Sequence, residues 1–310
     1  MDRLQSMSVF TAVAEDESFA GAARRLGLSP PAVTRAVAAI EERLGIRLLH
    51  RTTRSVRLTE AGGRYLEDCR RILAEIEEAE EAAAGLHREP RGQLALTAPV
   101  LFGRMHVTPL LLDFLALHPQ LAARTLFVDR VVNLMEEGVD VAVRIAELPD
   151  SGLTALKVGS VRRVLVASPG YLAEHGGPRE PAELVHHRTI AFRGLAPVAE
   201  WPFRRSGGEI AVRPAPWLTV NTAEMAITAA LRGGGIARVL SYMVAPELEA
   251  GRLRVVLEAF EAAPLPVHLV HQEGRRVSAR VRAFVDFAAA RLRAEPALAA
   301  SGAFPQSSPG

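Results

Sequence analysis

Residues 18–44 read SFAGAARRLGLSPPAVTRAVAAIEERL, and this stretch decides the fold of the N-terminal part of the chain. It predicts two short helices joined by a tight turn. Ser18 and Ser29 stand at N-cap positions, and Gly27 supplies the left-handed residue that ends the first helix. The two prolines after Ser29 suit a first helical turn, where a missing N–H costs little. This layout is that of a helix-turn-helix that docks in a DNA major groove, although any two-helix hairpin has similar caps.

The residues after the hairpin favour DNA binding over a plain helical domain. Residues 46–58 read IRLLHRTTRSVRL, and their alternation and β-branched residues predict a two-stranded ribbon. No acidic residue occurs between Gly45 and Thr59, and the ribbon carries Arg47, Arg51, Arg54 and Arg57. Beside a recognition helix, such arginines contact phosphates or enter the minor groove. We therefore predict a winged helix-turn-helix.

Residues 1–59 resemble the DNA-binding domain of the LysR-type transcriptional regulators. The resemblance is carried by MDRLQSMSVFTAVAE, SFAGAARRLGLS, PAVTRAVAAIEERLG and RLLHRTTRSVRLTEAG, and it extends to about residue 292. It implies double-stranded DNA as a partner, with contacts from Ser29, Pro31, Val33, Thr34, Arg35, Arg51, Thr52, Arg54 and Arg57. The chain departs from the family at Pro30, where glutamine is common, and at Ala36, where a polar residue is common. Base contacts by those two side chains are therefore not expected.

A long helix is predicted after the ribbon, from Thr59 to about residue 86, with Pro90 marking its end and Gly62 and Gly63 weakening its first turn. Its apolar positions alternate at spacings of four and three residues, which is typical of a helix packed along a partner helix or on its own domain. The resemblance favours a homodimer, paired into a tetramer. The expected dimer seam is Tyr65, Cys69, Ile72, Ile76, Ala79, Ala83 and Leu86. We expect Cys69 to be a buried apolar residue and not a redox switch.

The C-terminal two-thirds of the chain alternates predicted strands and helices, which indicates an α/β organisation with a largely parallel sheet. The resemblance implies a two-lobed, periplasmic-binding-protein-like effector domain, so the fold class is an α+β multidomain protein. The expected domains are a winged helix-turn-helix at 1–59, a linker helix at 60–90, an effector-binding domain at 91–295 and a disordered tail at 296–310. Lobe I is expected at about 92–163 and 268–293, and lobe II at about 164–267. Residues 131–138, VVNLMEEG, are expected to form a short helix.

A small-molecule effector is expected between the lobes, where strand ends and helix N-termini converge. Backbone N–H groups at helix starts can hold a carboxylate, and an arginine supplies a charge partner, so we expect an anionic metabolite. The expected effector-binding residues are Thr97, Pro99, Phe102, Arg144, Asn221 and Thr222. A plain helix cap or a surface arginine would give the same pattern at each position.

The composition is that of an ordinary globular protein, with 310 residues, 49% hydrophobic and 23% charged. Residues 1–59 hold nine arginines against six acids, and residues 60–90 hold nine acids against four arginines, which confines the expected DNA contact to the first domain. One cysteine excludes an internal disulfide. There is no signal pattern and no uninterrupted apolar run approaching about 18 residues, so we expect a cytoplasmic protein without a membrane partner.

Catalytic signatures are absent from the sequence: it contains no G-x-x-x-x-G-K-[ST], H-E-x-x-H or G-x-S-x-G motif. We therefore expect no enzyme, cofactor or metal. The prediction is a sequence-specific transcriptional regulator whose promoter binding is modulated by its effector, with RNA polymerase as a candidate partner. The alternative is an effector-independent repressor or architectural protein whose α/β domain only oligomerises.

Overall fold

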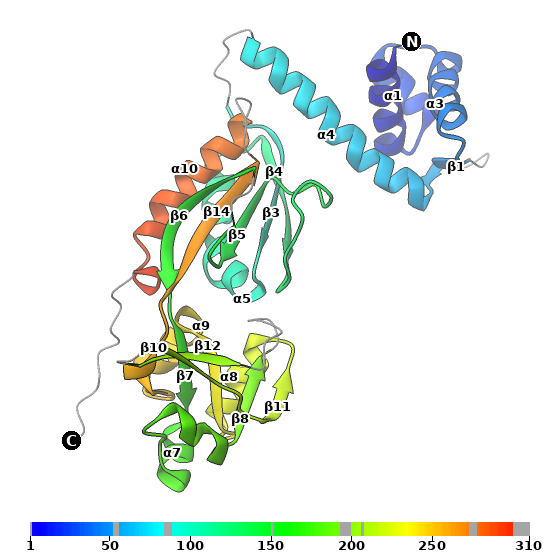
Figure 1. The fold of residues 1–310 in the computed structure, drawn as a ribbon. Coiled ribbons are helices and arrows are strands. Elements are labelled where there is room, and N and C mark those ends of the chain that lie inside the picture. Colours follow the sequence, from blue (N-terminus) through cyan, green and yellow to red (C-terminus); the bar gives the residue numbers. More distant parts are fainter. Residues whose placement is uncertain are drawn as a thin grey trace. The chain divides into compact units, whose positions relative to one another are not determined.

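The computed structural model describes residues 2–51, 56–83, 89–149, 152–192, 200–205, 208–272 and 278–299. The chain divides into two compact units, residues 1–88 and 89–310 (Figure 1). The division lies close to residue 91, where the effector domain is predicted to begin.

The first unit packs short helices and a two-stranded ribbon around one apolar core. Its elements are α1 (Arg3–Asp16), α2 (Phe19–Leu26), α3 (Pro30–Leu44), β1 (Leu49–Arg51), β2 (Val56–Leu58) and the start of α4 (Glu60–Ala83). At the start of α2, Ser18 Oγ accepts a hydrogen bond from the Gly21 amide at 3.1 Å, and Gly27 ends the helix at φ 65°. β1 and β2 pair antiparallel. The predicted winged helix-turn-helix is confirmed.

Ser29 stands at the N-cap of α3, but its hydroxyl makes no capping hydrogen bond. Pro30 and Pro31 have no amide to donate. The first available amides, those of Ala32 and Val33, donate to the Ser29 carbonyl at 2.9 and 3.2 Å. The predicted side-chain cap is therefore wrong, and the Ser29 hydroxyl remains on the exposed surface.

The first half of α4 packs on its own unit. The rings of Phe10 and Tyr65 lie 5.3 Å apart, Cys69 is fully buried in the core, and Ile72 packs against it. A heptad stripe buries itself against any neighbouring helix, and here that neighbour is α1. The predicted role of Cys69 in a dimer seam is therefore wrong. The rest of the dimer seam stays a prediction. It consists of Ile76 and of Ala79, Ala83 and Leu86, whose side chains lie outside the described residues.

In the described residues of the second unit, the strands form two mixed five-stranded sheets and one hairpin. Lobe I, in the order β4-β3-β5-β14-β6, contains β3 (Gly92–Ala98), β4 (Leu121–Phe127), β5 (Val141–Ile145), β6 (Leu153–Val161) and β14 (Leu265–Gln272). Lobe II, in the order β11-β8-β12-β7-β13, contains β7 (Arg163–Ala167), β8 (Thr189–Phe192), β11 (Pro216–Val220), β12 (Ile236–Leu240) and β13 (Arg254–Val256). The hairpin is β9 (Trp201–Arg205) and β10 (Gly208–Val212).

The prediction of largely parallel sheets is wrong. β3 runs parallel to β4 and β5, and β8 runs parallel to β11 and β12. β14 runs antiparallel to β5 and β6, however, and β7 runs antiparallel to β12 and β13. Both β7 and β14 follow a crossing of the chain between the lobes, and each enters its sheet against the direction of its neighbours. These crossings lie near Arg162 and Pro264, within a few residues of the predicted lobe boundaries.

The α-helices of the second unit are α5 (Val100–Phe102), α6 (Thr108–Leu117), α7 (Pro169–His175), α8 (Ala223–Leu231), α9 (Ser241–Glu249) and α10 (Ala279–Arg293). A π-helical turn, η1 (Gly103–Val107), joins α5 to α6. The resulting run, Val100–Leu117, is the one helix in the described part of the chain that is long and apolar enough to cross a membrane. Its side chains Leu101, Leu110 and Phe114 are buried in the lobe I core, as expected for a core helix.

Two local predictions are wrong. Residues 131–138 form turns and not a helix, with Asn133 Oδ1 accepting from the Met135 amide at 3.1 Å. The predicted tail begins with a 3-10 turn, η5 (Pro296–Leu298), whose Leu298 is buried against β6. Gly159 of β6 makes room for Leu298, because a Cβ at position 159 would lie 2.8 Å from Leu298 Cβ.

Candidate nucleic-acid interface and ligand site

The first turns of α3 present a polar, exposed face. Ser29, Pro31, Thr34 and Arg35 are all exposed, and the last three follow helical spacing on one side. Thr34 Oγ1 donates to the Pro30 carbonyl at 3.0 Å and keeps its acceptor lone pairs available. A helix face with a guanidinium and hydroxyl groups has the donors and acceptors that base edges and phosphates require.

Two positions of the same helix face the core. Val33 is fully buried and Ala36 is buried with it. The predicted DNA contact by Val33 is therefore wrong, because helical spacing places it on the inner stripe of α3 with Val37 and Ile40. Ala36 belongs to that buried stripe as well. A polar side chain at this position would face the core and not the DNA, so the alanine does not cost the protein a base contact.

Glu41 ties the recognition helix to the ribbon. This buried carboxylate accepts from the Leu48 and Leu49 amides at 2.9 and 3.2 Å through Oε1. Its Oε2 accepts from Arg47 Nη1 at 3.2 Å. These hydrogen bonds to one buried side chain hold α3 and β1 in a fixed relation. Sequence reasoning missed Glu41; its signal was an acid on the apolar stripe of α3.

The ribbon supplies a second basic surface. Arg57 on β2 is exposed and lies opposite the exposed His50 on β1. Of the other predicted contacts, Arg51 lies in β1 with its side chain outside the described residues, and Thr52 and Arg54 lie outside them entirely.

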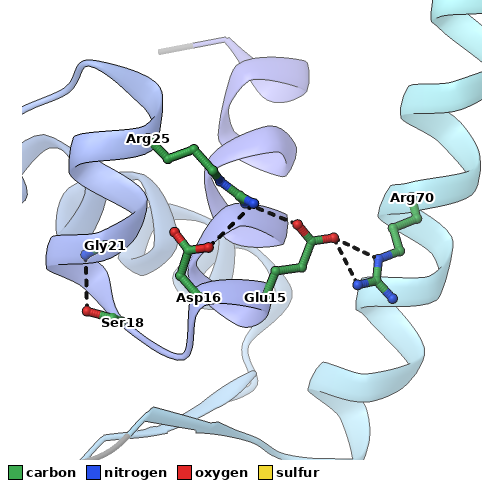
Figure 2. Close-up of polar contacts among 6 residues, drawn as sticks. All are labelled: Glu15, Asp16, Ser18, Gly21, Arg25 and Arg70. Atoms are coloured by element: carbon green, nitrogen blue, oxygen red, sulfur yellow. Dashed lines mark hydrogen bonds and ion pairs between the residues drawn. The ribbon is translucent and has the colours of Figure 1, made fainter.

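Ion pairs link α1, α2 and α4 (Figure 2). Arg25 Nη2 donates to Glu15 Oε2 at 3.1 Å, and Arg25 Nη1 lies 3.4 Å from Asp16 Oδ1. Arg70 of α4 donates to Glu15 Oε1 from Nε at 3.1 Å and from Nη2 at 2.9 Å. Glu15 therefore joins the helix-turn-helix to the linker helix.

In the second unit, the carboxyl ends of β3, β4 and β5 meet at one edge of the lobe I sheet, where ligands of α/β folds commonly bind. Pro99 precedes α5 here, Asp129 follows β4 and Arg144 lies near the end of β5. Asp129 Oδ1 accepts from the Val100 amide at 3.0 Å. A carboxylate of the chain therefore occupies the first amide of this helix start, and the predicted anion contact by the amides near Leu101 and Phe102 stays a prediction. Burial raises the pKa of Asp129.

Two of the predicted effector contacts serve the core. Thr97 is buried, and its Oγ1 donates to the Leu126 carbonyl at 2.6 Å. Phe102 is fully buried, with its ring 5.2 Å from the Tyr242 ring of lobe II in an edge-on arrangement. Predicted contact of Thr97 and Phe102 with an effector is therefore wrong: each lies on the inner side of its strand or helix.

The remaining predicted contacts are accessible. Arg144 is half-buried, and its Nη2 donates to the Val132 carbonyl at 2.8 Å. No acidic side chain in the described ranges lies within ion-pair distance of it. Asn221 is exposed, and Thr222 caps α8 by accepting from the Met225 amide at 3.3 Å. Among the described residues, Arg144 is thus a cation without a carboxylate partner at this edge of the sheet.

Sequence reasoning missed a polar cluster at the lobe contact. Tyr242 Oη and His106 Nε2 are buried and have no hydrogen-bond partner among the described residues, and the two rings lie 5.6 Å apart. Burial, with the charges of Asp129 and Glu224, raises the pKa of Tyr242, and burial lowers the pKa of His106. His106 lies in the π-helical turn η1, an irregularity frequent at functional sites. A lone histidine and a lone tyrosine carry no motif that would reveal them.

Two family models match adjacent parts of the chain. "Bacterial regulatory helix-turn-helix protein, lysR family" matches residues 4–63, and "LysR substrate binding domain" matches residues 87–293. The chain belongs to the LysR family. It is a DNA-binding transcriptional regulator with an effector-binding domain, and effector-modulated regulation is typical of LysR-type proteins. The family is one of transcriptional regulators.

Relatives extend over nearly the whole length. An HTH-type transcriptional regulator of Xanthomonas campestris pv. campestris is 39% identical over 293 residues, covering 93% of this chain and 85% of that protein. The solved structure of CrgA, a LysR-type transcriptional regulator from Neisseria meningitidis, is 32% identical with a TM-score of 0.60, covering 93% of this chain and 98% of that one. The full-length virulence activator AphB of Vibrio cholerae is 26% identical with a TM-score of 0.59, again covering 93% and 98%.

Proposed function

We propose that this LysR-type regulator binds promoter DNA as a dimer and that an acidic small molecule at the carboxyl edge of the lobe I sheet changes its DNA affinity. The observation that carries the effector proposal is Arg144, a half-buried cation with a backbone carbonyl partner and no carboxylate partner among the described residues. A guanidinium in that state has donors left for a carboxylate or phosphate.

The DNA contacts that we propose come from the exposed faces of α3 and the ribbon. They are Ser29, Pro31, Thr34, Arg35 and Arg57, together with Arg51, Thr52 and Arg54 from the ribbon run of the sequence. Recognition helices in a symmetric dimer read two half-sites one helical turn apart, and two dimers read four. In this proposal the dimer forms through Ile76, Ala79, Ala83 and Leu86 of the linker helix. The protein acts in the cytoplasm, and RNA polymerase is a further partner.

Contacts between the lobes give an effector a way to act. Arg104 Nε of η1 lies 3.8 Å from Glu224 Oε1 of α8, and Phe102 packs on Tyr242. Both contacts lie beside the carboxyl edge of the lobe I sheet. A ligand that binds one lobe arrangement better than another shifts the population toward it. These contacts therefore support a ligand-dependent change of the lobes.

DNA-binding titrations test the proposal. Anisotropy of a labelled operator fragment, selected from genomic DNA, is measured against a panel of mono- and dicarboxylates. We expect at least one acid to change the apparent Kd for DNA. Arg144→Gln should require at least tenfold more of that acid, a loss of about 1.4 kcal/mol. The control Arg204→Gln changes an exposed arginine of β9 and should respond as the parent protein does.

The outcomes separate the two candidate functions. If DNA binding is intact and no acid changes it, the effector-independent repressor or architectural protein is the better account. If an acid acts equally on the Arg144 and Arg204 variants, the effector role of Arg144 is wrong.

A further inference from the structure

Two arginines that are not among the predicted effector contacts lie on one face of the lobe II sheet. Arg163 begins β7 and Arg238 lies in β12, and these strands pair antiparallel with Leu165 opposite Arg238 and Leu240 opposite Arg163. Because alternate residues of a strand share a face, the two arginines occupy diagonal positions on the same side, typically about 7–8 Å apart.

This face of the sheet is covered by apolar residues. Leu165 and Ile236 are buried there in a cluster with Trp201 of the hairpin. The guanidinium carbon of Arg238 lies 5.2 Å from the centre of the Trp201 ring, and Arg238 is only 9% exposed. Arg163 is half-buried. Charges removed from water in this way carry a large free-energy penalty unless a counter-charge or a full set of hydrogen bonds compensates them.

The structure supplies little compensation for Arg238. Its Nη1 donates to the Glu200 carbonyl at 3.3 Å, which is a neutral and long contact. The Glu200 carboxylate is paired with Arg213 on the other side of the hairpin. Burial of Arg238, with a further contribution from the positive charge of Arg163, lowers the pKa of Arg238 to about 10.

Arg163 has no hydrogen bond or ion pair from its side chain anywhere in the described ranges. The carboxylates near the crossing, those of Glu258 and Glu261, pair with the preceding Arg162 at 3.2 and 3.1 Å. Neither guanidinium has a nitrogen that is both sealed from solvent and unpartnered. The spare donors of Arg163 and Arg238 are therefore open to a ligand that arrives from water.

We propose that Arg163 and Arg238 form a binding site for a small oxyanion, a carboxylate or phosphate group, in lobe II. Two guanidinium groups with spare N–H donors match the oxygens of such a group, and its negative charge relieves their mutual repulsion. The site is built on the lobe II sheet, whereas the proposed effector site at Arg144 is built on the lobe I sheet.

The position of the site suggests what the anion does. Next to it, the Arg162 amide donates to Ser241 Oγ at 3.0 Å, and the Ser241 amide donates to the Arg162 carbonyl at 2.8 Å. These bonds join the start of β7 to the end of β12 at the chain crossing. An anion held by Arg163 and Arg238 links the same two strands and stiffens lobe II beside the crossing.

Trp201 provides a direct reporter of binding. The chain has two tryptophans, and Trp217 is 59% exposed, so Trp217→Phe leaves Trp201 as the single tryptophan with little effect on packing. The full-length W217F protein is titrated with inorganic phosphate and, separately, with succinate, against sodium chloride of equal ionic strength. We expect a saturable change in Trp201 fluorescence with at least one oxyanion and none with chloride. The measurement needs no DNA.

Variants in the W217F background decide the assignment. Arg163→Gln should weaken binding at least tenfold, while Arg144→Gln should leave it unchanged. If R163Q does not fold, Arg163→Lys keeps the charge without the planar fork and should still weaken binding. The proposal is overturned by the lack of a saturable response to both oxyanions, by an equal response in the Arg163 variant, or by loss of the response in R144Q. The last outcome would locate the anion at the lobe I site.

Discussion

Gly62 and Gly63 are adjacent in the first turn of α4, and the structure assigns them opposite responses to alanine. A Cβ at Gly62 would lie 1.9 Å from the carbonyl oxygen of Leu48, whereas a Cβ at Gly63 would meet nothing within 4 Å. Gly63→Ala therefore gains helix propensity alone and should stabilise the first unit by about 1 kcal/mol. Gly62→Ala must move the start of α4 away from β1.

That movement has a definite cost. The Leu48 carbonyl accepts from the Thr59 amide at 3.0 Å and from Thr59 Oγ1 at 3.2 Å. Losing these bonds costs about 1 kcal/mol each and overpacking costs about 1–3 kcal/mol, against a gain of about 1 kcal/mol in propensity. We expect a net destabilisation of about 2–4 kcal/mol for Gly62→Ala.

Chemical denaturation followed by two signals measures both effects. Both tryptophans lie in the second unit, so their fluorescence should follow the same transition in both variants. Far-UV circular dichroism also reports the helices of the first unit. In Gly62→Ala only, it should show an additional unfolding transition at a lower denaturant concentration. The reasoning is refuted if Gly62→Ala is as stable as Gly63→Ala, because the close approach to Leu48 would then have no energetic consequence.

Three further outcomes are expected. Arg35→Ala should weaken operator binding more than random-sequence binding, whereas Arg57→Ala should weaken both and reduce the salt dependence of Kd; equal losses on both DNAs would reject this division. Cys69, whose pKa burial raises to about 11, should react with iodoacetamide at pH 8 at least tenfold more slowly in the native protein than in guanidinium, since the thiolate is the reactive form. Glu41→Gln should destabilise the first unit by about 1–3 kcal/mol, because an amide cannot accept from two backbone amides and a guanidinium as a carboxylate does; an unchanged unfolding midpoint would contradict the anchor role.

The sequence predicted what local chemistry determines. Ser18 and Gly27 cap the two ends of α2 as predicted, because a helix cap involves only neighbouring residues. Thr59 caps α4 for the same reason, since its Oγ1 accepts a hydrogen bond from the Gly62 amide at 2.9 Å. The cap at Ser29 failed through an equally local cause, the missing amides of the prolines after it.

What the sequence left open depends on contacts between distant segments. The strand directions of β7 and β14 follow from the path of the chain between the lobes, which no local pattern encodes. Arg163 and Arg238 are 75 residues apart, so only the register of β7 with β12 brings them onto one face. The heptad stripe of α4 gives another example. Its spacing predicts that the stripe is buried, but only the fold determines which residues Cys69 packs against.

The burial of that stripe limits how a signal can reach DNA. Cys69 lies in the core of the first unit, and Arg70 beside it is held by Glu15 at 2.9 Å. Because Glu41 also fixes the ribbon to α3, the recognition helix, the ribbon and the first half of α4 form one mechanical body. Bending α4 near Cys69 would open the core, which is far costlier than rotating the whole body. A regulatory change that arrives along the linker must therefore reorient recognition helix and ribbon together, altering the spacing between half-sites and not the way that each half-site is read.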